Sequence, residues 1–156
     1  MKWQDVLEHP SLQDLPFKIE LNEWGQIVMS PASNKHSNLQ AELGRLLKQS
    51  LPEGRIFTEC SIDTPRGVKV ADVAWASNAF IERYGYETPY PRAPEICVEI
   101  RSPSNTTAEM DEKIMLYLAK GAQEVWIGDL EGRLTFHGNE GELERSNLAP
   151  RFPSQI

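Results

Sequence analysis

The chain has 156 residues, of which 40% are hydrophobic and 25% charged, and its formal net charge is -7. This length and composition predict one folded domain over residues 1–156 and exclude a disordered tail, a collagen-like chain and a coiled coil. The acidic balance argues against a passive, high-affinity binder of a nucleic-acid backbone. Carboxylates are also what a metal-dependent site needs, so composition leaves both interpretations open.

Apolar runs and cysteines indicate the compartment. No run is long enough to span a bilayer, so no membrane contact is expected. The first five residues lack the apolar stretch of a secretory signal, which favours a cytoplasmic location. The two cysteines, Cys60 and Cys97, do not have CxxC spacing, which predicts reduced core residues.

The first elements are an extension and a hairpin. Residues 1–16 are predicted to form an N-terminal extension with a short helix, because His-Pro and Leu-Pro clusters interrupt it. Phe17–Leu21 alternates apolar and polar residues, as a half-buried strand does. A turn and a second apolar run, Ile27–Met29, complete an N-terminal β-hairpin.

A helix and a second hairpin follow. Ser33 or Asn34 is the expected N-cap, and leucines recur at helical spacing until Pro52–Gly54 ends the helix. Two strands at 55–62 and 68–75 flank a Pro-Arg-Gly turn, which is a strong hairpin signal.

The second half alternates strands and helices. Its expected elements are a loop or short helix (77–94), a strand (95–100), a helix to about Lys120 with Gly121 as C-cap, two strands (124–129 and 134–137) and an irregular C-terminal tail (147–156). With no repeat or linker in the chain, these elements predict a single α/β domain.

Asp72 is an acid on a strand face that should be apolar. In the predicted strand Val68–Trp75, alternation places it on the same side as Val68, Val70 and Ala74. Burial of a lone carboxylate costs several kcal/mol unless the group is paired or binds a metal. A structural Asp that is paired to an Arg or caps a turn is the alternative.

Glu99 repeats this pattern between Val98 and Ile100, in a nearly continuous apolar strand. It is alternatively a buried ion pair or an edge residue that faces water. If its strand and that of Asp72 are neighbours, the two carboxylates repel each other unless a cation lies between them. Ligation by oxygen alone predicts Mg²⁺ or Mn²⁺ rather than zinc.

Polar residues elsewhere fit the same site. Lys113 flanks the apolar stripe of its helix, and Glu20 is the acid of the first strand. His36 and Gln40 share one helix face near the helix N-terminus. Each has an ordinary alternative. Lys113 is then a solvated lysine paired with Glu109, and Glu20 is a solvent-facing acid of its strand. His36 and Gln40 are then the polar end of an apolar stripe.

Together these residues resemble the Uma-two family of putative restriction endonucleases, a branch of the PD-(D/E)xK restriction-endonuclease-like superfamily. The resemblance runs from about Phe17 to Asp129. Its most specific part is the block Val98-Glu99-Ile100-Arg101-Ser102-Pro103-Ser104, followed by Glu112-Lys113 with Tyr117.

The resemblance implies a restriction-endonuclease-like domain, with a mixed central β-sheet flanked by helices. Asp72 matches the motif Asp, Glu99 its second acid, and Glu20 the acid that this branch carries ahead of its first long helix. The superfamily lysine normally stands at the position of Arg101, whereas in this branch it comes from the following helix and matches Lys113. Arg101 is a poor substitute as a base because it is always protonated.

The implied chemistry is hydrolysis of DNA by a divalent-metal-dependent endonuclease. Asp72, Glu99 and the main-chain carbonyl of Ile100 would hold one Mg²⁺ or Mn²⁺, and Lys113 would orient the attacking water or neutralise the phosphate. Glu20 would ligate a second ion or position the first through water. Contacts with the substrate or with the metal ligands are expected of three further residues, His36, Gln40 and Arg101.

Partners follow from charge and from function. Residues 35–69 hold six basic and four acidic residues, a net of +2, and are the expected phosphate-facing surface. The Tyr- and Arg-rich loop 77–94 is a second candidate, or else a dimer contact or a flap over the core. A homodimer is expected because a small nuclease cuts both strands most easily in pairs.

Two functions stay open at this stage, besides a weaker third one. The first is the metal-dependent endonuclease, and the second is a catalytically inactive module that keeps the nuclease fold for protein or nucleic-acid interaction. The charge of -7 and the presence of Arg101 favour the second. A hydrolase for another substrate class is the third, and neither a GxSxG motif nor a P-loop supports it.

Overall fold

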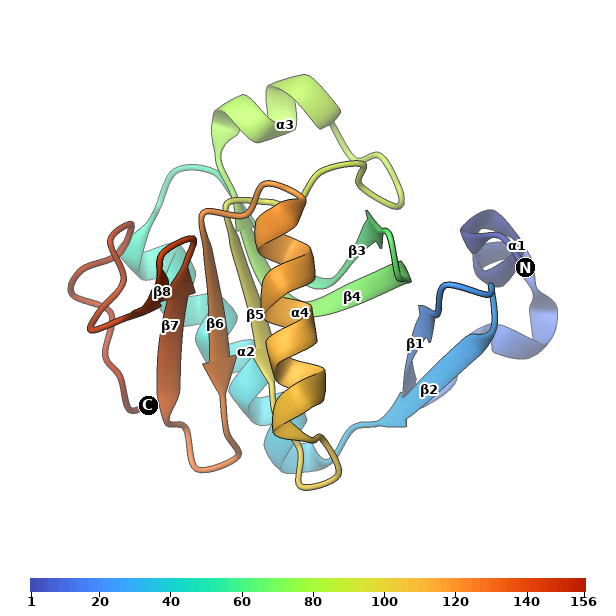
Figure 1. Ribbon diagram of the computed structural model, residues 1–156, viewed down its shortest axis with the longest axis horizontal. Helices are drawn as coiled ribbons and strands as arrows, with labels where there is room; N and C mark the ends of the chain where they lie inside the picture. Colours follow the sequence, from blue (N-terminus) through green and yellow to red (C-terminus); the bar gives the residue numbers. More distant parts are fainter.

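A computed structural model describes residues 1–156 and contains a six-stranded sheet. Helices cover both faces of this sheet (Figure 1). The elements in chain order are α1 (Trp3–Glu8), a 3₁₀ turn (Pro10–Leu12), β1 (Phe17–Leu21), β2 (Ile27–Pro31), α2 (Asn34–Ser50), β3 (Arg55–Thr64), β4 (Gly67–Ala76), α3 (Asn78–Tyr84), β5 (Ile96–Ile100), α4 (Thr107–Ala119), β6 (Glu124–Gly128), β7 (Leu134–Gly138) and β8 (Gly141–Leu143).

The strands of the large sheet follow chain order from β3 to β8, and one pair alone is parallel. That pair is β5 and β6, with Ile96 opposite Glu124 and Ile100 opposite Gly128. Parallel neighbours need a crossover connection, and α4 provides it across one face of the sheet (Figure 1). The sheet is mixed because this one parallel pair lies among antiparallel ones. The opposite face is covered by α2, so the sheet is buried on both sides.

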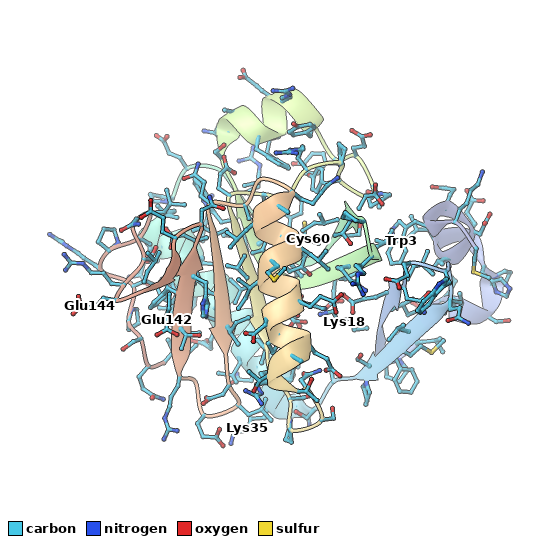
Figure 2. All side chains as sticks on the ribbon, in the orientation of Figure 1. Trp3, Lys18, Lys35, Cys60, Glu142 and Glu144 are labelled. Carbon is cyan, nitrogen blue, oxygen red and sulfur yellow. The ribbon has the colours of Figure 1, made fainter.

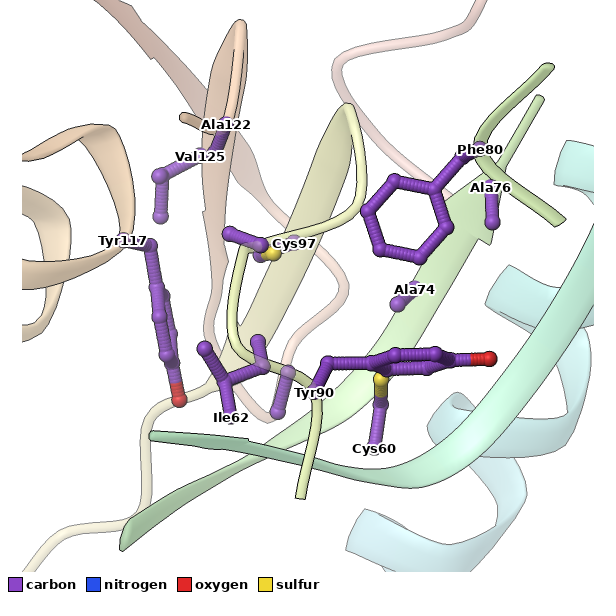
Figure 3. Close-up of a cluster of buried hydrophobic side chains, with 12 residues drawn as sticks. Cys60, Ile62, Ala74, Ala76, Phe80, Tyr90, Cys97, Tyr117, Ala122 and Val125 are labelled. Carbon is purple, nitrogen blue, oxygen red and sulfur yellow. The ribbon is translucent and has the colours of Figure 1, made fainter. Parts of the chain in front are cut away.

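Alternation along the central strands divides the core into two layers. On the α2 side, Leu43 and Leu47 pack with Val73, Val98 and Trp126. The α4 side contains Tyr117 of α4 and, from the sheet, Ala74, Cys97 and Val125, as Figure 3 shows. Because a strand exposes successive residues to opposite faces, Asp72 and Glu99 belong by position to the α4 side.

The N-terminal hairpin forms a separate two-stranded sheet beside the large one (Figure 1). Its strands pair from Phe17 opposite Pro31 to Leu21 opposite Ile27. A small apolar cluster of Val6, Leu21 and Val68 attaches it and the preceding extension to β4. A close approach fixes the hairpin at the β3–β4 turn, where a Cβ on Gly67 would lie 2.2 Å from the Leu21 carbonyl oxygen.

The C-terminal segment 147–156 contains no helix or strand, yet it closes one end of the core. Ala149 and Phe152 are buried with Trp126 and Phe136. The carboxylate of Glu124 accepts hydrogen bonds from the backbone amides of Asn147 and Leu148 at 3.1 and 2.9 Å. The segment is therefore irregular in conformation but firmly packed.

The observed elements confirm the predicted single α/β domain, mixed sheet and N-terminal hairpin. Ser33 is the N-cap of α2, since its Oγ accepts from the His36 amide at 3.1 Å. The short strand β8 was not predicted. Both cysteines are buried and unpaired. None of the helices is long and apolar enough to cross a membrane.

Candidate active site

A cleft of about 740 Å³ opens between the hairpin and the N-terminal half of α4. Its hairpin wall includes Phe17, Lys18 and Met29, and its opposite wall includes Met110 and Lys113. The carboxylates of three acids from three different strands, Glu20, Asp72 and Glu99, lie along it. Figure 2 labels Lys18 in the region between the hairpin and α4.

The sheet register brings Asp72 and Glu99 together. β4 and β5 are antiparallel, and Val73 pairs with Val98. The next position along the same register sets Asp72 opposite Glu99. Both side chains are almost fully buried, with 1% and 2% exposed. One Asp72 oxygen, Oδ2, accepts from the Ile100 amide at 2.7 Å, so the contact of Ile100 with this acid is through its N–H.

Lys113 reaches the acids from α4. Its Nζ lies 2.7 Å from Glu20 Oε2 and 3.2 Å from Glu99 Oε1. A capping box of Thr106 and Glu109 begins this helix, which sets the direction in which Lys113 projects. The structure thus brings together four of the residues expected in the site, and the lysine is not a solvated one.

Two further hydrogen bonds fix the oxygens that Lys113 contacts. Glu20 Oε2 also accepts from the Val70 amide at 2.6 Å, which attaches the hairpin acid to β4. Glu99 Oε1 accepts from the Tyr117 hydroxyl at 2.7 Å. Tyr117 is fully buried and one turn beyond Lys113 on α4, so it holds Glu99 from the core side.

Lys18 is the member of the site that sequence reasoning missed. Its Nζ lies 3.2 Å from Asp72 Oδ1 and 2.9 Å from Glu99 Oε2, and its side chain is 12% exposed. One signal for it was present in the sequence. Lys18 and Glu20 are two residues apart in a predicted strand and therefore share a face.

His36 and Gln40 both contact Asp72 from α2. His36 Nε2 lies 3.5 Å from Asp72 Oδ2, while its buried Nδ1 has no partner. Gln40 Nε2 donates to the Asp72 carbonyl oxygen and to Glu59 Oε1, each at 2.8 Å. Glu59 has a positive φ of 56°, uncommon for a non-glycine residue. The Gln40 amide therefore bridges a strained position to the backbone of Asp72.

Arg101 lies apart from the carboxylates. Its guanidinium donates to Thr107 Oγ1 at 3.4 Å, beyond ordinary hydrogen-bond length, and it pairs with no acid. It follows directly after β5, and its amide donates to the Gly128 carbonyl. The structure therefore places Lys113 of α4 beside the acids, whereas Arg101, two positions after Glu99, lies away from them.

Burial and neighbouring cations act in opposite directions on the acids. Burial would raise the pKa of the Asp72 carboxyl, but the Lys18 ammonium, the His36 ring and the Ile100 amide hold it well below its usual range. Burial would likewise raise the pKa of Glu20, but Lys113, Lys18 and the Val70 amide lower it. At Glu99 burial prevails over Lys113 and Lys18, and the pKa is raised.

The basic groups respond to the same charges. Burial would lower the pKa of the Lys18 ammonium, but the carboxylates of Glu99, Asp72 and Glu20 raise it well above its ordinary value. The hydrogen bond to Asp72 raises the pKa of His36, which burial opposes. Asp72 is thus an ionised acid held between two basic groups.

The basic segment 35–69 does not form a free positive surface. Arg45 pairs with Glu42 at 3.0 Å, and Arg66 lies 3.4 Å from both Glu23 and Glu112. The Lys48 ammonium donates to backbone carbonyls of the loop that follows α2. Lys69 lines the cleft without an ion pair. The expected phosphate-facing surface is therefore smaller than its composition indicated.

The aromatic loop 77–94 is mainly a cover over the core. Phe80 and Tyr90 are buried with ring centroids 5.0 Å apart, and the Tyr90 hydroxyl donates to the Gly85 carbonyl. Tyr86, with 67% of its surface exposed, packs on Phe57. These contacts favour the flap interpretation over base stacking.

The carboxylates are arranged to hold a cation, and in this structure the cations are lysines. No group of three or more His, Cys, Asp and Glu side chains is arranged to hold a metal ion. Asp72 and Glu99 nevertheless direct one oxygen each at the same Lys18 Nζ. Two acid oxygens that converge on one positive centre fit a hard divalent ion such as Mg²⁺ or Mn²⁺.

Comparisons with known proteins give a family for the chain and a solved structure of similar fold. The family Uma2, described as "Putative restriction endonuclease", matches residues 3–152. A solved structure described as a putative nuclease belonging to DUF820, from Anabaena variabilis, superposes with a TM-score of 0.72 at 19% identity. That match covers 96% of this chain and 93% of the other. No curated protein matches the chain.

Proposed function

Since the chain belongs to the Uma2 family of putative restriction endonucleases, we propose that it is a divalent-metal-dependent endonuclease that hydrolyses phosphodiester bonds of DNA. One observation carries the proposal. Asp72 and Glu99, from neighbouring strands, already hold one positive centre between them beside a cleft of about 740 Å³. Paired buried acids with an open approach are typical of metal-dependent phosphate chemistry.

The metal ligands in this proposal are Asp72, Glu99 and the Ile100 carbonyl, with Glu20 as a further acid that ligates a second ion or positions the first through water. Oxygen ligands favour Mg²⁺ or Mn²⁺. When bound, such an ion lowers the pKa of a coordinated water and stabilises negative charge on the phosphate.

The other site residues orient these acids and the substrate. Lys113 Nζ, held by Glu20 and Glu99, donates to a phosphate oxygen or to the attacking water. Tyr117 fixes Glu99, while His36 and Gln40 fix Asp72 and contact the substrate. Arg101, outside the acid cluster, is proposed as a phosphate contact because its charge is permanent and no acid neutralises it.

Nicking of supercoiled plasmid DNA in Mg²⁺ or Mn²⁺ tests the proposal. We expect Asp72→Asn and Glu99→Gln each to lower the rate at least about a thousandfold, because metal assistance supplies several kcal/mol. Glu82→Gln, an exposed acid on α3, is the matched control and should keep the wild-type rate. Cleavage that persists in both site variants would contradict this assignment.

Assembly and location belong to the same proposal. Two copies in a homodimer would cut both DNA strands in one encounter, and a cytoplasmic protein would meet DNA directly. Sedimentation that shows a monomer at micromolar concentration, with plasmid present and absent, would remove the dimer. Fractionation of cells tests the location.

A second candidate is a nuclease-fold module without catalysis, for protein or nucleic-acid interaction. The position of Lys18 favours it, because this ammonium already neutralises the two acids that a metal needs. The plasmid assay separates the candidates, since a module gives no metal-dependent cleavage in any variant, the wild type included.

A further inference from the structure

Lys18 holds the two oxygens of the acid pair that no other group holds. Asp72 Oδ2 is taken by the Ile100 amide and the His36 ring, and Glu99 Oε1 by Tyr117 and Lys113. The remaining oxygens, Asp72 Oδ1 and Glu99 Oε2, both contact Lys18 Nζ. These two oxygens have no other donor, so they are the ones that an ion shared by the two acids would reach without breaking another contact.

We propose that Lys18 is a built-in competitor of the divalent ion, so that metal binding to Asp72 and Glu99 displaces the Lys18 ammonium into the cleft. The inference rests on the proposed function, because the divalent ion is part of that proposal. It adds a residue that sets metal affinity and keeps the site assembled when no metal is bound.

Electrostatics gives the reason for such a residue. Two carboxylates set opposite each other on neighbouring strands repel each other in the absence of a cation. The Lys18 ammonium removes that repulsion in the metal-free protein. The same contacts weaken metal binding, because the ion must break two charge-assisted hydrogen bonds before it reaches the oxygens.

The position of Lys18 in the fold allows this exchange. It lies on β1, in a hairpin that shares no hydrogen-bonded ladder with the large sheet, and its side chain lines the cleft. A flexible four-carbon stem lets the ammonium leave without movement of the strand. Lys113 differs, because its shorter contact is with Glu20 and lies outside the Asp72–Glu99 pair.

Calorimetric titration with Mn²⁺ tests the proposal on the full chain. We expect Lys18→Met to bind Mn²⁺ at least about tenfold more tightly than wild type, which corresponds to about 1.4 kcal/mol. Lys69→Met is the matched control, because it removes a lysine from the same cleft that pairs with no acid. Its affinity should stay close to wild type.

The other outcomes are distinguishable. Equal or weaker binding by Lys18→Met, with binding lost in Asp72→Asn, overturns the role of Lys18 and leaves the metal site intact. Tighter binding in both lysine variants to the same degree overturns it too, because a general change in cleft charge then explains the effect. Absence of Mn²⁺ binding in wild type and Lys18→Met at millimolar metal overturns the proposed metal-dependent function together with this inference.

A second measurement needs no variant, in case Lys18→Met does not fold. Reductive methylation of wild-type lysines, read by mass spectrometry, reports which ammonium groups are accessible. We expect Lys18 to be protected in chelator and to become modified in Mg²⁺, while Lys69 reacts equally in both. Protection of Lys18 that persists in Mg²⁺, at metal concentrations where calorimetry shows saturation, contradicts displacement.

Discussion

Two glutamates on neighbouring parallel strands, Glu99 of β5 and Glu124 of β6, are equally buried but are held by donors of different kinds. Each has 2% of its surface exposed, and each accepts hydrogen bonds from three residues. The donors to Glu99 are two ammonium groups and the Tyr117 hydroxyl. Those to Glu124 are the Trp126 indole at 3.0 Å and two backbone amides of the C-terminal segment.

The difference lies in what the donors can do. The donors to Glu124 are neutral groups fixed by the backbone and the core, so this acid fastens residues 147–156 to the sheet. The ammonium donors to Glu99 sit at the ends of long, flexible side chains beside the cleft, and in our proposal a divalent ion replaces one of them. Burial alone therefore does not separate a site acid from a structural one, and the kind of donor is what distinguishes Glu99 from Glu124.

Removal of the Glu124 carboxylate should give the largest change in stability. We expect Glu124→Ala to lower the free energy of unfolding by about 3 kcal/mol, because it strands the Trp126 indole N–H and frees two amides, and each buried unpaired donor costs about 1–3 kcal/mol. Urea denaturation measures this loss. Glu124→Gln keeps one acceptor and should lose less.

Mn²⁺ affinity of the Glu124 variants is the control for this comparison. It should equal that of wild type, since Glu124 does not line the cleft. A Glu124→Ala protein that keeps wild-type stability, or that loses metal binding while folded, would break the distinction between anchor and site.

Glu99→Gln should change stability much less than Glu124→Ala. Gln keeps an acceptor oxygen at this position, and the substitution removes the repulsion between the carboxylates of Glu99 and Asp72, which offsets part of the lost ion pairing. Lys18 keeps Asp72 as a partner, and Lys113 keeps Glu20. We expect the free energy of unfolding in chelator to change by less than about 1 kcal/mol. A loss as large as that of Glu124→Ala would make Glu99 a structural anchor.

Three buried acids, Asp72, Glu99 and Glu124, show which parts of the candidate site the sequence predicts. Alternation was enough to find Asp72 and Glu99, because each interrupts an apolar strand. Glu124 escaped the same argument because it is the first residue of its strand, where a polar residue is unremarkable. The strand order β4–β5–β6 then decided which acids meet, and local pattern alone does not contain it.

Lys18 shows the other limit. Its partners Asp72 and Glu99 are 54 and 81 positions away, and only the folded hairpin brings them into reach. Lys113 was found through the family resemblance, because its helical spacing alone predicts a solvated lysine. Charge counts misled for residues 35–69, where several basic side chains pair with acids or with backbone carbonyls.

Two histidines, one in the site and one outside it, differ in the direction of their pKa shifts, and their expected effects are the smallest. His36, in the site, has its pKa raised by its hydrogen bond to Asp72, whereas burial lowers the pKa of His137 on β7, against the opposing charge of Glu142. NMR titration of the imidazole signals in chelator should give midpoints above 6.5 for His36 and below 6.5 for His137. His36→Gln and His137→Gln assign the two signals.

The opposite shifts have opposite consequences for stability. The contribution of His36 is fully present below the unfolded pKa of about 6.5 and is lost as pH rises through its higher folded pKa. That of His137 is present above about 6.5 and is lost as pH falls through its lower folded pKa. The difference in free energy of unfolding between wild type and His36→Gln should therefore shrink as the pH rises above about 6.5. The difference between wild type and His137→Gln should shrink as the pH falls below about 6.5. A His36 midpoint below 6.5 would mean that the Asp72 charge does not reach this ring, and the contrast between the two regions would then rest on the glutamates alone.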